Sequence, residues 1–126
     1  MKALTLKEPW ATLVVNGYKT YEFRSWKTNY RGKILIHAGM SKENKVLPIF
    51  EKYNLDYSCG EIIGEAEIID CILVDEEFSK KLNKINKDVY YKDTYIGKYA
   101  WVLSNMKKYE KTIPIKGKLG LWNYNV

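Results

Sequence analysis

The two arginines of the chain, Arg24 and Arg31, fall within residues 17–32, whereas the lysines are spread along the whole length. The planar guanidinium group of arginine grips phosphate or carboxylate through two parallel hydrogen bonds, while lysine is a flexible point charge suited to a solvated surface. The same stretch adds further polar and aromatic side chains: Lys19, Glu22, Trp26 and Tyr30. Together these residue types predict a polar site that binds an anion beside an aromatic surface.

A strand is predicted to position these side chains, because polar and apolar residues alternate over residues 20–26. The alternation turns Tyr21 and Phe23 toward a core. Four residues occupy the opposite face: Thr20, Glu22, Arg24 and Trp26. Neighbours on one strand face lie about 7 Å apart, so Glu22 and Arg24 can interact. We interpret this face as a preorganised cationic pocket in which Glu22 orients Arg24 or accepts a hydrogen bond from a base, the alternative being a structural ion pair that closes a barrel.

The rest of the pattern predicts short strands with two or three interspersed helices. Strands are expected near residues 4–6, 33–38, 61–74, 99–103, 113–115 and 121–124, with a bulge or bend at Gly64. Helices are expected after Pro9, over residues 46–53 with Ser41 as N-cap, and over residues 75–83, and residues 86–98 are expected to form a loop. Because no strand–helix–strand unit repeats, the pattern predicts an α+β fold, a small mixed β-barrel with two to three flanking helices.

Length and charge narrow the class of protein. The 126 residues predict a single domain over residues 1–126. The net charge is +6, and its distribution is uneven. Basic residues dominate residues 16–33 and 107–118, and acidic residues dominate residues 61–77. Segregated positive charge predicts an anionic partner, nucleic acid first, whereas a general bias toward lysine would explain the net charge but not the placement of the arginines.

Cysteine and histidine usage argues against a metal site. Cys59 and Cys71 match neither a disulfide framework nor a zinc spacing, and His37 is the only histidine, so we expect no metal and no cofactor. No apolar run is long enough to cross a membrane, and residues 1–9 lack the apolar core of a signal peptide. We therefore expect a reduced, cytoplasmic protein with no membrane partner.

Five sequence blocks, in order, carry a family resemblance. They are Pro9-Trp10-Ala11; Gly17-x-Lys19-x-x-Glu22-x-Arg24; Trp26-Lys27-Thr28 with Tyr30-Arg31-Gly32 and Leu35-Ile36-His37-Ala38; Gly64-x-Ala66-Glu67 with Asp70-Cys71; and Pro114-x-Lys116-Gly117-Lys118 with Gly120-Leu121-Trp122. Over nearly its whole length the chain resembles the activating signal cointegrator homology (ASCH) domain, a relative of the PUA fold. The second block matches the family's GxKxxExR motif.

The resemblance implies a PUA-like β-barrel with a cleft beside the helices that binds RNA or a modified nucleotide. Some small members of the family look like amidohydrolases acting on acylated cytidine, with a lysine, a threonine and a glutamate in catalysis, and others are suspected nucleases. In the amidohydrolase type a threonine stands at the position of Glu22, so the glutamate here favours a binding module. The alternative is a small hydrolase acting on a modified nucleoside or on RNA. There Lys19 would be base or electrostatic stabiliser and Glu22 proton acceptor, with Thr20 or Thr28 in place of the missing threonine.

The residues assigned to ligand binding share positive charge, hydrogen-bonding capacity or an aromatic ring. They are Lys19, Thr20, Glu22, Arg24, Trp26, Lys27, Tyr30, Arg31, His37 and Lys116. Each has a structural alternative, since a single histidine on a strand, an aromatic residue or a surface charge is often only structural. Glu65 and Glu67 share a strand face and form either an acid pair or an exposed face paired with lysines. Covalent catalysis by Cys59 is a further, weaker alternative.

Overall fold

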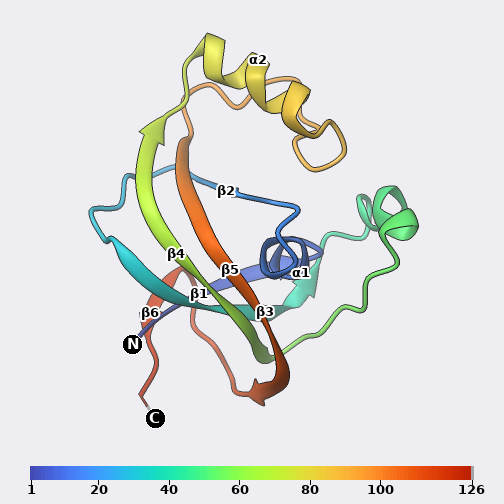
Figure 1. Ribbon diagram of the computed structural model, residues 1–126, viewed down its shortest axis with the longest axis vertical. Helices are drawn as coiled ribbons and strands as arrows, with labels where there is room; N and C mark the ends of the chain where they lie inside the picture. The colour runs from blue at the N-terminus through green and yellow to red at the C-terminus, as the bar shows by residue number, and fades with distance from the viewer. Residues whose placement is uncertain (126) are drawn as a thin grey trace.

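The computed structural model describes residues 1–125 and consists of six strands and three short helices (Figure 1). In chain order the elements are β1 (Lys2–Glu8), α1 (Trp10–Val15), β2 (Tyr21–Arg24), β3 (Gly32–Lys42), the 3₁₀ helix η1 (Leu47–Tyr53), β4 (Glu61–Leu73), α2 (Glu76–Ile85), β5 (Tyr99–Pro114) and β6 (Leu121–Asn123). None of the described helices is long and apolar enough to cross a membrane.

The six strands form one mixed sheet in the order β2-β5-β4-β3-β1-β6. Only β1 and β3 run parallel, and the other neighbours are antiparallel. Figure 1 shows β4 and β5 as long, curved strands side by side, with α2 beyond one end of the pair. The predicted α+β fold is therefore confirmed, but the sheet is open, because its edge strands β2 and β6 do not pair with each other within residues 1–125.

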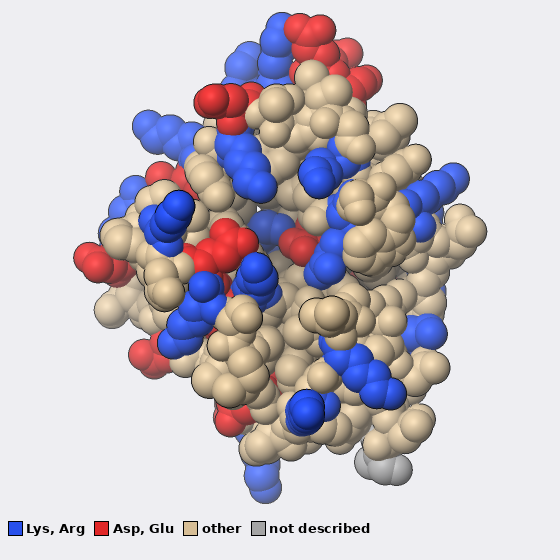
Figure 2. Space-filling view, turned by 180° about the vertical axis from the view of Figure 1, so that it is seen from behind, with Lys and Arg blue, Asp and Glu red and all other residues tan. Residues whose placement is uncertain are grey.

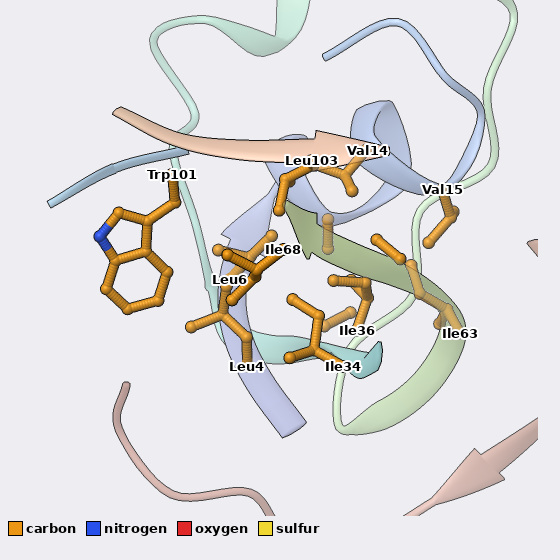
Figure 3. Close-up of a cluster of buried hydrophobic side chains, with 13 residues drawn as sticks. Leu4, Leu6, Val14, Val15, Ile34, Ile36, Ile63, Ile68, Trp101 and Leu103 are labelled. Carbon is orange, nitrogen blue, oxygen red and sulfur yellow. The ribbon is translucent and has the colours of Figure 1, made fainter. Parts of the chain in front are cut away.

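The main core lies between α1 and the curved face of the sheet (Figure 3). Its members are the buried residues Leu4, Leu6, Ala11, Val14, Val15, Ile34, Ile36, Ala38, Ile63, Ala66, Ile68, Trp101 and Leu103. Helix α1 approaches the sheet closely at Gly64, where an added methyl group would overlap the side chain of Val15 and the carbonyl of Lys107. The pairing of β4 with β5 shifts register beside Gly64, which confirms the irregularity predicted there.

A second apolar cluster packs the other side of β2. Tyr21 and Phe23 lie against buried side chains from η1, α2 and the loop before β5, among them Phe50, Leu82 and Tyr90. The prediction that Tyr21 and Phe23 face a core is thus confirmed. Since Glu22 and Arg24 alternate with them, the strand directs those two side chains to the other face.

Two predicted boundaries are wrong. Residues 113–115 do not form a separate strand, because β5 runs unbroken to Pro114 and pairs there with Glu61 at the start of β4. Ser41 does not cap a helix, because β3 continues to Lys42, which pairs with Glu8. The following helix is a 3₁₀ helix that begins at Leu47 and has no side-chain cap. In both places pairing with a neighbouring strand outweighs the local sequence signal.

Candidate functional site

A tight turn after α1 brings Lys19 inside the molecule. Gly17 has a φ of 82°, a left-handed conformation that glycine adopts without strain. The backbone N–H groups of Tyr18 and Lys19 then both donate to the carbonyl of Leu13, at 2.9 and 3.2 Å. Lys19 is left only 4% exposed. A lysine this buried requires partners, since an unpaired charge in the interior is costly.

Glu22 supplies one of those partners and joins Lys19 to Arg24. The Nζ of Lys19 lies 2.7 Å from Oε1 of Glu22 and also donates to the carbonyl of Tyr21 at 2.6 Å. The other carboxylate oxygen, Oε2, lies 3.2 Å from Nε of Arg24, and the Glu22 side chain is only 12% exposed. We call Lys19, Glu22 and Arg24 the ion-pair network. Two cations share one anion, so the network keeps one net positive charge.

The guanidinium of Arg24 is held in place from several sides. Its Nη2 donates a hydrogen bond to the carbonyl of Thr5 at 3.2 Å. The carbon at its centre lies 5.6 Å from the ring centroid of Trp26 and 6.0 Å from that of Trp101, within cation–π distance. The Nε contact with Glu22 is an ion pair without hydrogen-bond geometry, which leaves this buried atom without a hydrogen-bond partner in the described residues. The guanidinium of Arg24 is therefore held in a fixed orientation, while part of its hydrogen-bonding capacity remains unused within the described residues.

Trp26 offers an aromatic surface next to Arg24. It is 46% exposed and meets the buried ring of Trp101 edge to face, with centroids 5.9 Å apart. The indole Nε1 of Trp101 donates to the Trp26 carbonyl at 3.3 Å. The ring of Trp26 is thus anchored on one side and open to solvent on the other, as stacking of a flat ligand requires.

The loop before β5 contributes a residue that sequence reasoning missed. The hydroxyl of Tyr90 accepts hydrogen bonds from the backbone N–H groups of Thr20 and Tyr21, at 3.0 and 3.2 Å. Burial raises the pKa of the Tyr90 hydroxyl. Tyr90 thereby fixes the start of β2, which carries the ion-pair network. Its only sequence signal is the abundance of tyrosine in residues 86–98, a pattern that by itself predicts no more than a loop.

Three other predicted site residues belong to the segment between β2 and β3. Lys27 is exposed. Arg31 donates from Nη1 to the carbonyls of Thr28 and Tyr30, at 3.1 and 2.9 Å, and its Nη2 lies 3.8 Å from Asp70. The hydroxyl of Tyr30 donates to the carbonyl of Lys33 at 2.7 Å, and its ring packs on the main core. The polar contacts of Tyr30 and Arg31 thus lie in their own segment, on β3 and on β4.

His37 and Lys116 lie at a second location, on the other side of Thr5. Nε2 of His37 is 2.8 Å from the carbonyl of Ile115, and Nδ1 is 3.2 Å from Oγ1 of Thr5. The indole Nε1 of Trp122 donates to the same Oγ1 at 2.9 Å. Since a carbonyl only accepts, we infer that Nε2 carries the proton and that the Thr5 hydroxyl donates to Nδ1. Both ring nitrogens of His37 are engaged within the protein.

An open pocket of about 570 Å³ adjoins this histidine. Its lining includes Thr5, His37, Met40, Lys116, Lys118 and Leu119. We call it the His37 pocket. Sequence reasoning placed His37 and Lys116 in one cleft with Arg24. In the structure His37 and Arg24 both bond Thr5, while Lys116 lines the His37 pocket and has no hydrogen bond or ion pair to Arg24 among the described residues.

Glu65 and Glu67, the acidic residues of β4 that sequence reasoning considered as an acid pair, have different hydrogen-bond partners. Glu65 accepts a hydrogen bond from Tyr109 at 2.8 Å and lies 3.2 Å from Nζ of Lys33, while Glu67 accepts from Asn105 at 2.8 Å. The hydroxyl of Tyr109 holds the pKa of Glu65 below its usual value, and burial raises the pKa of Tyr109 to about 12. Within residues 1–125, no group of three or more His, Cys, Asp or Glu residues could hold a metal ion.

Sequence reasoning also missed the buried carboxylate of Glu8. Its Oε1 accepts from the backbone N–H of Thr12 at 2.8 Å, and its Oε2 accepts from the Thr12 hydroxyl at 2.5 Å and from the backbone N–H of Ser58 at 3.1 Å. Burial raises the pKa of this carboxyl group despite these three donors. Glu8 therefore joins α1 to the segment before β4. The only signal is its place directly before Pro9, at the start of α1.

Figure 2 shows the face opposite to that of Figure 1, the side toward which β2 lies. This face is hollowed near its middle, and blue and red side chains meet at the floor of the hollow. Basic side chains surround it on several sides. The surface view is consistent with a recessed group of charges on the β2 side of the molecule.

The mixed sheet with few helices is a fold of the ASCH type. The family model of the ASCH domain matches residues 4–113, and the chain belongs to this family. The ASCH protein of Zymomonas mobilis superposes with a TM-score of 0.64 at 17% identity, covering 98% of this chain and 87% of that one. A tyrosine-to-phenylalanine mutant of that protein superposes with a TM-score of 0.58 at 19% identity, covering 90% and 74%. At these identities the two structures support the fold alone.

Two curated relatives are longer proteins. The chain is 29% identical over 131 aligned residues to the human protein activating signal cointegrator 1, covering 94% of this chain and 21% of that protein. The mouse protein of the same name is 28% identical with the same coverage. The chain thus spans about a fifth of the length of these relatives.

Proposed function

We propose that this ASCH domain binds RNA or a nucleotide in a cleft built on the ion-pair network and Trp26. The observation that carries the proposal is the recessed, net positive pair of cations around Glu22 beside a half-exposed indole. Membership of the ASCH family and the segregated basic residues of the sequence support the same class of partner.

The side chains of the cleft match the chemical groups of a nucleotide. Lys19 uses two of its three N–H bonds on Glu22 and Tyr21, so one remains for a ligand oxygen. Arg24 retains Nη1 for a phosphate or a base edge. The open face of Trp26 suits a base, and such stacking contributes roughly 1–3 kcal/mol where it occurs. Lys27 and Arg31, in the segment after Trp26, are proposed to contact the backbone of a longer strand.

The arrangement favours binding over hydrolysis. Both oxygens of the Glu22 carboxylate face cations, so Glu22 is better placed to orient Lys19 and Arg24 than to accept a proton from water. Lys19 is likewise already paired and acts as a donor to an anion.

A salt titration tests the proposal. Single-stranded RNA should bind the purified chain, and the logarithm of the affinity should fall linearly with the logarithm of the salt concentration, by roughly 0.7 per phosphate neutralised. Trp26→Ala should weaken binding about tenfold, whereas Ile85→Ala, which removes an exposed apolar side chain on α2, should not. Absence of binding at low salt, or equal effects of the two substitutions, would contradict the proposal.

A further inference from the structure

The His37 pocket combines an apolar surface with positive charge. Leu119 is 95% exposed and Met40 is 76% exposed, so two large apolar side chains beside the pocket are left uncovered by the chain itself. Lys116 and Lys118 are exposed at its rim, and none of the residues that line it is acidic. A pocket of this kind suits a ligand with a flat or apolar body and an anionic group.

Thr5 connects this pocket to the ion-pair network. Its carbonyl accepts the hydrogen bond of Arg24, and its hydroxyl bonds His37 at the pocket. Its backbone N–H donates to the carbonyl of Gly120 at 3.2 Å. A methyl group on Gly120 would lie 4.0 Å from the ring of Trp26. The segment 117–120 therefore lies beside Trp26 at one end and lines the pocket along most of its length.

We propose that the His37 pocket binds the next nucleotide of a single strand whose first nucleotide lies at Arg24 and Trp26. The base packs against Met40 and Leu119, and its phosphate contacts Lys116 and Lys118. This inference rests on the proposed function of the Arg24 site and adds to it a second subsite with its own residues. Continuity through Thr5 and residues 117–120 favours a strand over an isolated anionic amphiphile, which would need no neighbouring site.

Affinity as a function of strand length tests the inference. Native protein should bind a ribodinucleotide and a ribotetranucleotide about tenfold more tightly than a ribomononucleotide. Leu119→Glu should remove this gain and leave mononucleotide affinity within about twofold of the native value. The matched control is Ile85→Glu, since Ile85 is another exposed aliphatic residue, on α2. The control should keep the gain.

The lysines give a second readout. The double substitution Lys116→Gln with Lys118→Gln should lower the salt slope for the tetranucleotide by roughly 0.7, because both lysines contact the same phosphate and its neutralisation is lost. The control Lys84→Gln, in the last turn of α2, should lower it by much less. Because all the substituted positions are exposed to solvent, folding should be unaffected, and circular dichroism checks this.

The outcomes separate the two proposals. Native protein that binds mononucleotide but gains nothing with length overturns the second subsite and leaves the first. Equal losses in Leu119→Glu and Ile85→Glu also overturn it, because the effect would then be a general charge effect. Native protein that binds no strand at all overturns both. Binding of laurate that depends on Leu119, with tetranucleotide binding that does not, assigns the pocket to an acyl anion and overturns the inference.

Discussion

Nζ of Lys19 and Oε1 of Glu22 lie 2.7 Å apart although both side chains are largely removed from solvent. The pair spans the glycine turn after α1 and the start of β2, so it ties two elements together at the point where the site is built. The second carboxylate oxygen of Glu22 forms an ion pair with Arg24. One carboxylate thus sets the positions of two cations.

Glu22→Gln should destabilise the fold and weaken RNA binding. The substitution leaves Lys19 and Arg24 without their shared anion in a recessed site, at a cost of about 1–3 kcal/mol in the free energy of unfolding. Urea denaturation measures this cost. The control is Glu76→Gln, which breaks the exposed pair with Lys80 on α2 and should cost less than about 0.5 kcal/mol. Equal effects of the two substitutions would show that the network does not stabilise the site.

Lys19→Ala should lower the affinity for RNA by about tenfold or more, because it removes a preorganised charge that is held by Glu22 and packed between the rings of Trp10 and Phe23. Lys84→Ala, which removes an exposed lysine of α2, is the control and should change affinity little. The native protein should show no turnover of acylated cytidine or of RNA. Turnover by native protein that Lys19→Ala abolishes, with affinity retained, would establish the hydrolase alternative instead.

The local parts of the fold were predictable from sequence. Alternation in residues 20–26 assigned opposite faces to Phe23 and Glu22, and Asp75 marked the start of α2, where its side chain accepts from the N–H of Phe78 at 2.8 Å. The ends of elements that depend on distant partners were not predictable. The extension of β5 to Pro114 follows from pairing with Glu61, more than fifty residues earlier in the chain.

The residues of the candidate site also divide into those that local sequence predicts and those that depend on distant contacts. Lys19, Glu22 and Arg24 are near neighbours in sequence, so strand geometry alone could bring them together. Tyr90, in contrast, lies sixty-nine residues after Tyr21, whose backbone N–H donates to the Tyr90 hydroxyl. No local sequence pattern predicts a contact between such distant residues. Likewise, the separate location of His37 depends on its hydrogen bonds to Thr5 and Ile115, which lie on other segments.

The buried carboxyl group of Glu8 predicts a particular pH dependence. Burial raises its pKa above the ordinary value near 4.5, so the folded state binds a proton that the unfolded state has already released. The stability of the native protein should therefore fall, relative to that of Glu8→Gln, as the pH rises from 4.5 through the raised pKa. Glu8→Gln should itself be less stable throughout, because its amide NH2 group replaces a carboxylate oxygen and leaves a backbone N–H such as that of Ser58 without its acceptor.

Urea denaturation of both proteins between pH 4 and pH 7 measures the difference in their free energies of unfolding, which we call the stability gap. The gap should be widest at the acid end and narrow toward neutral pH. Glu51→Gln, at an exposed position on η1, is the control and should not change the pH dependence in this way. A gap that widens with pH would mean that the carboxylate is favoured in the folded state, contrary to the direction given by burial.

Gly117→Ala should disturb the His37 pocket specifically. An added methyl group would overlap the imidazole of His37, which cannot turn aside without losing its hydrogen bonds to Thr5 and Ile115. Overpacking of this kind costs typically 1–3 kcal/mol. Since residues 117–120 line the pocket, the substitution should also remove the affinity gained with strand length. The control Lys118→Ala is exposed and should cost less than about 0.5 kcal/mol in stability. Unchanged stability together with an unchanged length dependence in Gly117→Ala would show that the contact with His37 does not hold this segment in place.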